Sequence, residues 1–181
     1  MAEHLPFVDA SVFLGMHHQD SHLRRRALAF FASYYRRGVR MNFEQVGICD
    51  AIIWQLRRDV QDAYYPFMDR LHSDMAILRE GYGQQELELY ARDSRMSGLR
   101  SDQALLALQV ICNGAILFTL DPVLRRLPAL KAHLGDFAAL DAAVLPKPLP
   151  SLYATSRVYT HTDKDWDYVE ARYFHPLDHP A

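Results

Sequence analysis

Two apolar runs that each end in an aspartate place the strongest constraint on the fold of this chain. Residues 5–8 run into Asp9, and residues 115–120 run into Asp121, which Pro122 follows. Continuous apolar runs of this length are typical of parallel strands that are covered on both faces. The carboxyl ends of parallel strands meet at one edge of a sheet, where open α/β folds bind ligands. The two runs therefore predict an α/β fold with carboxylates gathered at that edge.

The rest of the chain alternates between helical and strand patterns. The spacing of apolar residues predicts helices over residues 17–37, 44–64, 66–79, 84–92 and 103–113. A short strand is expected over residues 39–43, and the final edge strand falls in either 130–134 or 137–144. Asp20 or Ser21 is the expected cap of the first helix, and Ser101 or Asp102 that of the last. This alternation predicts a three-layer α/β/α fold with a central parallel sheet flanked by helices.

Length and composition favour one principal domain. A chain of 181 residues with 50% apolar content can bury one ordinary core. We assign that domain to residues 1–145. Three prolines between residues 146 and 150 mark a connector, and an aromatic extension runs to residue 181. Its aromatic content predicts that residues 146–181 pack on the domain or on a second subunit, which makes a homodimer plausible.

Net charge and cysteine usage limit the partners and the cellular compartment that we expect for this chain. The formal net charge of -2 does not by itself attract nucleic acid. Cys49 and Cys112 lack metal-ligand spacing and sit in apolar patterns, as reduced thiols of a cytoplasmic protein do. No apolar run reaches the length of a membrane span, and the N-terminus does not resemble a secretion signal, so neither membrane insertion nor secretion is expected.

Arginine dominates the basic clusters of the sequence. Its guanidinium group suits bidentate contacts with phosphate. The alternative is that each cluster lies on a solvated helix face and pairs with nearby acids. If the clusters share one groove, the candidates for nucleic-acid contact are Arg24, Arg25, Arg36, Arg37, Arg40 and Arg125.

The acidic residues suggest a metal site. One aspartate at a strand end is most often a cap or turn residue, but several at one sheet edge repel each other unless a cation neutralises them. Carboxylate oxygens are preferred ligands of Mg²⁺ and Mn²⁺. The candidates are Asp9, Asp102, Asp121 and one acid from the segment that holds Glu44 and Asp50.

Three blocks of the sequence resemble the signature blocks of the PIN-domain family, which includes the VapC-type toxin ribonucleases. The blocks are residues 7–11 (FVDAS), 101–107 (SDQALLA) and 118–121 (FTLD), within a resemblance that covers residues 5 to about 145. In that family, a strand ends in the first acid, a helix begins with the third, and a Thr-x-Asp pattern supplies the fourth. The resemblance thus implies that Asp9, Asp102 and Asp121 are metal ligands.

The second acid of the family pattern has two candidates in this chain. Asp50 follows an apolar and a small residue, as the family's glutamate does, whereas Glu44 has the expected side chain at the helix start. The local pattern favours Asp50, and the helix dipole could equally explain Glu44 as a first-turn acid. Leu120 is a further departure, because a polar residue is common at that position.

The resemblance implies a metal-dependent endoribonuclease whose partners are an RNA substrate and an antitoxin-like inhibitor protein. One or two Mg²⁺ or Mn²⁺ ions would activate water at the phosphodiester, and Ser11 and Thr119 would orient the carboxylates. Two alternatives stay open. The Asp-for-Glu change and Leu120 favour a degenerate module that binds RNA or protein without cutting. The residues beyond a minimal PIN domain favour a hydrolase acting on a small phosphorylated molecule.

Overall fold

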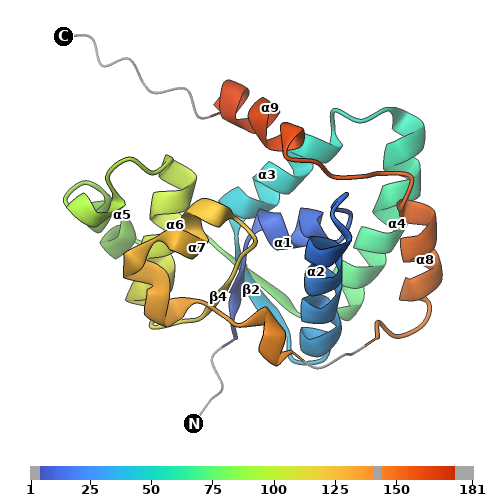
Figure 1. Ribbon diagram of the computed structural model, residues 1–181, viewed down its shortest axis with the longest axis horizontal. Coiled ribbons are helices and arrows are strands. Elements are labelled where there is room, and N and C mark those ends of the chain that lie inside the picture. The colour runs from blue at the N-terminus through green and yellow to red at the C-terminus, as the bar shows by residue number, and fades with distance from the viewer. Residues whose placement is uncertain (1–4, 141–143, 174–181) are drawn as a thin grey trace.

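Four short parallel strands form the centre of the molecule. They are β1 (Phe7–Val8), β2 (Val39–Asn42), β3 (Ile77–Glu80) and β4 (Leu117–Phe118), in the order β3-β2-β1-β4 (Figure 1). The computed structural model describes residues 5–140 and 144–173. Because β1 and β4 are hydrogen-bonded neighbours, the residues that follow them, Asp9 and Asp121, leave the sheet at the same edge.

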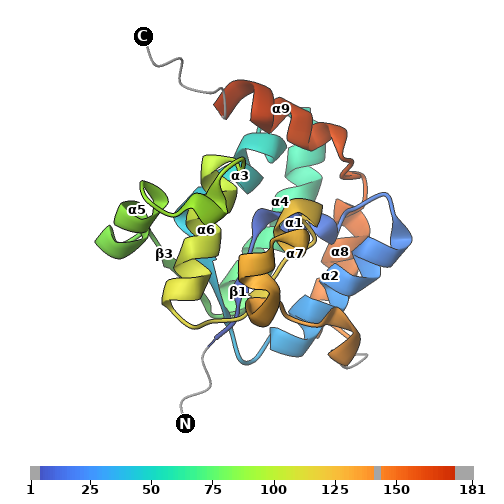
Figure 2. The ribbon, with the colours of Figure 1, turned by 60° about the vertical axis from the view of Figure 1, so that its left-hand side comes forward.

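Helices cover the sheet on both faces. The bounds of those in the first layer are α1 (Ala10–Gly15), α2 (Ser21–Tyr34), α3 (Phe43–Ile53) and α4 (Arg58–Asp74). The opposite layer holds α5 (Gln84–Tyr90), α6 (Ser101–Cys112) and α7 (Pro122–Arg126), and Figures 1 and 2 show it across the sheet from α2 and α4.

Alternation along the strands explains why two cores form. Val8 and Phe118 pack into the core with α1–α4, whereas Phe7 and Leu117 pack into the core with α6. Successive side chains of a strand point to opposite faces, so the two-residue strands each feed both layers. The predicted three-layer α/β/α fold is therefore confirmed.

The C-terminal part folds back onto the first layer. Helix α8 (Leu149–Ser156) packs against α4, and α9 (Lys164–Tyr173) packs against α3. Leu149, Tyr159 and Val169 are buried in the same core as the strands. The connector and the following residues, as far as residue 173, are thus part of the domain; the aromatic Phe174 lies outside the described residues.

Two of the predicted helices were wrong in their extent. The expected helix over 44–64 breaks between Ile53 and Arg58, and Pro66 lies inside α4 instead of beginning a helix. The expected helix over 66–79 ends at Asp74, because residues 77–80 form β3, the edge strand beside β2. Tertiary pairing with β2 here overrides the helical spacing.

The ends of the sheet also differ from expectation. Residues 128–133 and 137–139 form 3-10 turns, and only Leu134 makes an isolated bridge with Leu117, so neither predicted edge strand forms among the described residues. Residues 141–143 lie outside them. The short helix α1 was not anticipated, and the helix predicted over 17–37 begins at Ser21, with Asp20 as its cap.

Within the two described ranges, no helix combines the length and the apolar content that crossing a membrane requires.

Candidate active site

Asp9 lies at the centre of the predicted site. It follows β1, caps α1 and is 2% exposed. The Ser11 hydroxyl donates to Oδ1 at 2.5 Å, and the Thr119 hydroxyl donates to Oδ2 at 2.5 Å. Burial raises the pKa of Asp9 to about 7; the two hydroxyl bonds oppose the rise, and the charge of Asp121 adds to it. Asp9 is therefore a carboxylate whose negative charge is poorly compensated.

The two hydroxyls have fixed directions. Ser11 Oγ accepts the backbone N–H of Leu120 at 2.7 Å, and Thr119 Oγ1 accepts that of Asp121 at 3.0 Å. Because each oxygen accepts an N–H, its own proton is directed to Asp9. The loop after β4 is thereby tied to the residue after β1, which is the orienting role expected for Ser11 and Thr119.

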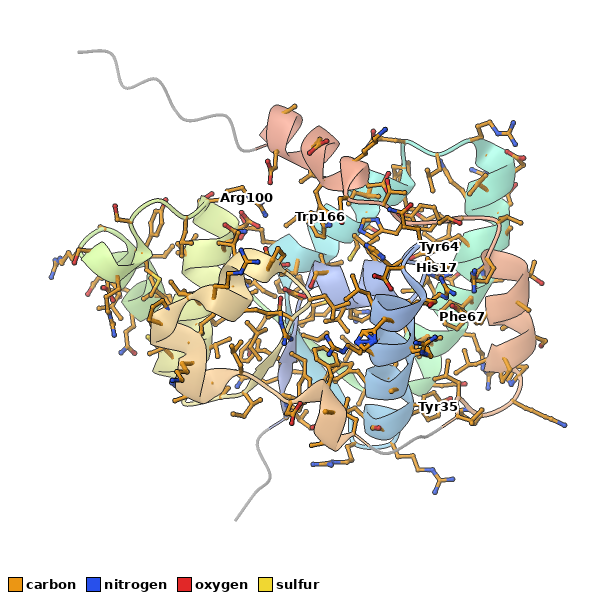
Figure 3. The ribbon with its side chains drawn as sticks, viewed as in Figure 1. His17, Tyr35, Tyr64, Phe67, Arg100 and Trp166 are labelled. Carbon is orange, nitrogen blue, oxygen red and sulfur yellow. The ribbon has the colours of Figure 1, made fainter. Side chains whose placement is uncertain are left out.

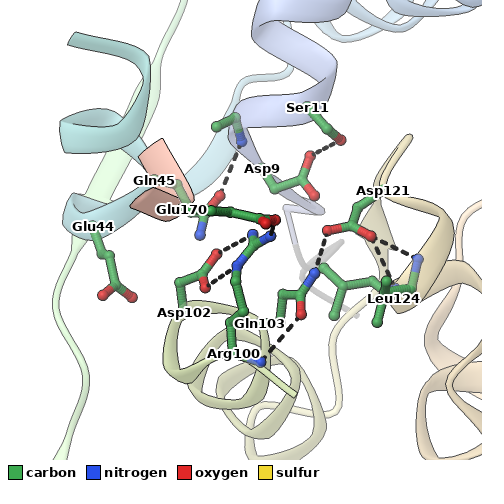
Figure 4. A network of polar contacts seen from close by, with 12 residues as sticks. Asp9, Ser11, Glu44, Gln45, Arg100, Asp102, Gln103, Asp121, Leu124 and Glu170 are labelled. Carbon is green, nitrogen blue, oxygen red and sulfur yellow. Dashed lines mark hydrogen bonds and ion pairs between the residues drawn. The ribbon is translucent and has the colours of Figure 1, made fainter. Parts of the chain in front are cut away.

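Asp121 is held by α7 and by α6. Its Oδ1 caps α7 by accepting the N–H groups of Val123 at 2.7 Å and Leu124 at 3.3 Å. Its Oδ2 accepts from the Gln103 side-chain amide at 2.8 Å (Figure 4). The position of Asp121 is therefore set from two helices.

Asp102 already has a cationic partner. It is 3% exposed, and the guanidinium of Arg100 donates to its two oxygens at 3.0 and 2.9 Å. Arg100 also pairs with Glu170 of α9 (Figure 4). Burial by itself would lower the pKa of Arg100. The bond to Asp102 and the charges of Asp102, Glu170 and Asp121 outweigh burial and raise the pKa. One guanidinium thus serves several acids of the site.

Glu44, not Asp50, lies near these acids. Burial raises the pKa of Glu44, the Tyr82 hydroxyl bond at 2.5 Å opposes this, and the charge of Asp102 adds to it. Asp50 instead lines a separate pocket of about 170 Å³ with Arg79. Of the two candidates for the second acid, Glu44 thus lies beside the acidic site and Asp50 lies in a separate pocket.

The start of α3 determines which of the two acids faces the site. Asn42 caps the helix by accepting the N–H of Glu44, which places Glu44 in the first turn. Gln45 faces the site, because its amide oxygen accepts the N–H of Ala10 at 3.1 Å. Asp50 is five residues further, roughly 140° around the helix axis, and so points elsewhere.

The donor chemistry of the site fits a hard divalent cation, but the arrangement is not a finished metal site. All side-chain donors of Asp9, Asp102, Asp121 and Glu44 are carboxylate oxygens. Among the residues that the structure describes, however, no three acidic, histidine or cysteine side chains form a group that could hold a metal ion. Arg100 engages both oxygens of Asp102, and Tyr82 binds Glu44. A metal would have to displace at least the guanidinium.

The predicted arginine groove does not form. Arg36 and Arg37 follow the end of α2, whose 14 residues place them roughly 20 Å from its first turn. Arg40 pairs with Glu80 and lies over the Phe7 ring. The remaining three bond locally: Arg24 to the backbone of His18, Arg25 to Ser21 and Arg125 to the backbone of Thr119.

A pocket of about 230 Å³ opens beside the acids. Ser11, Gln103, Asp121 and Arg100 line it together with residues of α9 and of the segment before α2. The sequence patterns did not identify Arg100, Gln103, His18, His161 or Trp166 as site residues. For Arg100 and Gln103, closeness in sequence to Asp102 was an available signal. Trp166 lies 157 positions from Asp9, and no local sequence pattern marks it as a site residue.

Comparisons with known proteins identify a family but not an activity. The resemblance to PIN domains stays a prediction. A comparison with curated proteins gave no match. The sequence profile of a family described as "Family of unknown function (DUF6190)" matches residues 1–166. The chain therefore belongs to the DUF6190 family.

Proposed function

We propose that this chain is a metal-dependent endoribonuclease that hydrolyses RNA phosphodiester bonds at the acidic site. The observation that carries the proposal is the convergence of Asp9, Asp121 and Asp102 from the ends of two neighbouring parallel strands and the start of α6. Three distant segments bring carboxylates together where an α/β sheet binds ligands.

The electrostatics of the site favour an added cation. Asp9, Asp102, Asp121, Glu44 and Glu170 contribute five carboxyl groups, and Arg100 is the guanidinium that pairs with two of them. Negative charge of this density would repel the phosphates of RNA. Burial raises the pKa of Asp9 to about 7, and the negative charge of Asp121 adds to the rise; a nearby cation would lower it.

The residues of the chain have distinct parts in this proposal. Asp9 and Asp121 would hold Mg²⁺ or Mn²⁺ with Asp102 and with Glu44 nearby, and Ser11 and Thr119 would keep Asp9 oriented. The ion would neutralise charge on the phosphodiester and activate water. Arg100, released from Asp102, would contact a phosphate oxygen, for which its guanidinium geometry is suited.

A second candidate is a module that binds RNA or protein without cutting it. The bidentate pairing of Arg100 with Asp102 favours this candidate, because an internal guanidinium already takes the place of a cation. The compartment and partners are proposals under either function. Both cysteines are free, which agrees with the cytoplasm; the partners are RNA, an antitoxin-like inhibitor and a second copy of the chain.

Cleavage of labelled total RNA separates the two candidates. Purified protein is incubated with Mn²⁺ or Mg²⁺, with EDTA in parallel, and Asp9→Asn is the matched variant. Discrete products that require metal and disappear in Asp9→Asn would support the nuclease. Retention of RNA without cleavage, at every metal concentration, would support the binding module and reject the nuclease.

A further inference from the structure

We infer that the pocket beside the acids holds one unstacked nucleobase of the RNA, with Trp166 as its stacking surface. This inference rests on the proposed function. Ser11, Gln103 and Asp121 line the pocket and also belong to the acidic site. A base in the pocket would therefore place an adjacent phosphodiester at the carboxylates.

The walls of the pocket are largely apolar. Trp166 contributes an indole from α9, on the side of that helix toward the domain (Figure 3). Leu120, Pro122 and Val123 contribute aliphatic surface from the segment that begins α7, and Val123 is 45% exposed. An aromatic ring with aliphatic surface around it suits the flat face of a base, and every base offers such a face.

Two histidines supply a polar edge. The Nδ1 of His18 accepts the backbone N–H of Asp20 at 2.9 Å, so in the neutral ring Nε2 carries the proton. The Nδ1 of His161 lies 3.0 Å from both Asp165 and the Tyr159 hydroxyl. If it donates to that carboxylate, its Nε2 is an acceptor. The Nε2 of His18 lies 3.5 Å from the Asp163 carboxylate, so a base edge would compete with that exposed acid for the donor. With ring centres 5.6 Å apart, the two histidines line the same side of the pocket.

The wall that carries Trp166 is held in place. Glu170 pairs with Arg100 of the opposite layer, and the buried Val169 packs in the core. At the start of α9, Asp165 accepts the N–H of Thr162 at 2.7 Å. The buried His161 ring meets the indole in a T-shaped arrangement, with ring centres 5.8 Å apart. The stacking surface is therefore part of the folded domain.

The charge of the pocket favours an uncharged ring over an anion. The acids that line it are Asp121, Asp163 and Glu170. Among its described lining residues, Arg100 is the one lysine or arginine. A free phosphate or carboxylate ligand would meet more negative than positive charge there. The neutral base of a nucleotide avoids this repulsion, while its phosphate lies outside the pocket.

Tryptophan fluorescence can test the pocket without any cleavage. The chain has two tryptophans, and Trp54 is 71% exposed. In a Trp54→Phe variant, the tryptophan fluorescence comes from Trp166 alone. This variant is titrated with each of the four ribonucleosides in metal-free buffer. We expect saturable quenching by at least one nucleoside. The matched variant Trp166→Phe reports only from Trp54, and we expect no saturable change.

Cleavage patterns provide the second readout. Stacking on an aromatic side chain is commonly worth roughly a 10-fold change per base, so Trp166→Leu should raise KM for RNA by about that factor and weaken the base preference at the cleavage site. The circular dichroism of each variant checks its fold. No saturable quenching of Trp166, with cleavage-site preference unchanged in Trp166→Leu, would overturn the inference. Quenching without any RNA cleavage would keep the pocket and reject the nuclease, whereas cleavage without quenching would reject the pocket alone.

Discussion

The acidic site beside Asp9 and the pocket that Asp50 lines both contain carboxylates, but the two bring them together differently. Beside Asp9, acids arrive from the ends of β1 and β4 and from the start of α6. Between α3 and α4, Asp50 is exposed and lines a smaller pocket with Asp69, His72 and Arg79. Full burial raises the pKa of Asp9, and the partial burial of the Asp50 carboxyl raises its pKa as well. Arg79 opposes the rise for Asp50, while Asp121 adds to it for Asp9.

The difference lies in how each set of acids is brought together. Parallel strand ends bring distant residues to one edge, where their charges add, and under the proposed function a cation would neutralise them. An acid on a helix face meets whatever the neighbouring helix and strand provide, and here that is an arginine. The strand ends therefore place the acidic site, and the helical pattern around Asp50 does not.

The largest expected contrast is in RNA cleavage. Asp121→Asn should lower kcat/KM by about 1,000-fold or more, because it removes a negatively charged oxygen ligand at the reacting phosphate. Asparagine also caps helices well, so α7 should persist. Asp50→Asn is the control and should change the rate by less than about twofold. Equal losses in the two variants would mean that the pockets are not functionally different.

The second contrast is in the pH dependence of stability. The folded-state pKa of Asp9, about 7, lies above its ordinary value of 3.8, so between these values the folded state binds more protons than the unfolded state. The free energy of unfolding of the metal-free protein should thus fall as the pH rises from about 4 to 7, by roughly 4 kcal/mol at most, and be level above. Asp9→Asn should remove this slope, and Asp50→Asn should leave most of it. Urea titrations at several pH values measure this slope. A wild-type free energy of unfolding that rises over the same pH range would contradict a raised pKa of the buried Asp9.

A smaller effect is expected from the hydroxyls. Thr119→Val removes the donor to Asp9 and the acceptor for the N–H of Asp121. Cleavage should fall by about 10- to 100-fold, as it does for residues that orient metal ligands. Tyr65→Phe removes a hydroxyl from the Asp50 pocket and is the matched control. A rate in Thr119→Val equal to that of Tyr65→Phe would show that Asp9 needs no orienting partner.

The smallest effect is a gain. Arg100→Ala removes the guanidinium that competes for Asp102, so the affinity for Mn²⁺ should rise by about 10-fold. Arg79→Ala removes an arginine from the Asp50 pocket and should leave the affinity unchanged. Isothermal titration with Mn²⁺ compares the two variants. Weaker binding in Arg100→Ala would show that Arg100 supports the metal site instead of competing with it.

The sequence could predict β1, β2 and β4 and the acids that follow β1 and β4, because their signals are local. An apolar run followed by an aspartate places Asp9 and Asp121 at a sheet edge whatever the helices do. Which acid of α3 faces the site depends on where that helix begins, and the Asn42 cap sets its start. If the start is misplaced, a side chain is assigned to the wrong face of the helix. The break at residues 54–57 and the strand at 77–80 arise from pairing and packing between distant segments. Trp166 and His161 reach the site only because the C-terminal part folds back over α3.

Binding of Mn²⁺, followed by electron paramagnetic resonance of the free ion, tests the central claim most directly. Wild-type protein, Asp121→Asn and Asp50→Asn are titrated under identical conditions. We predict saturable binding by the wild type and by Asp50→Asn, and its loss in Asp121→Asn. Absence of binding by folded wild-type protein, or binding that Asp50→Asn abolishes and Asp121→Asn retains, would contradict a metal site at the strand ends.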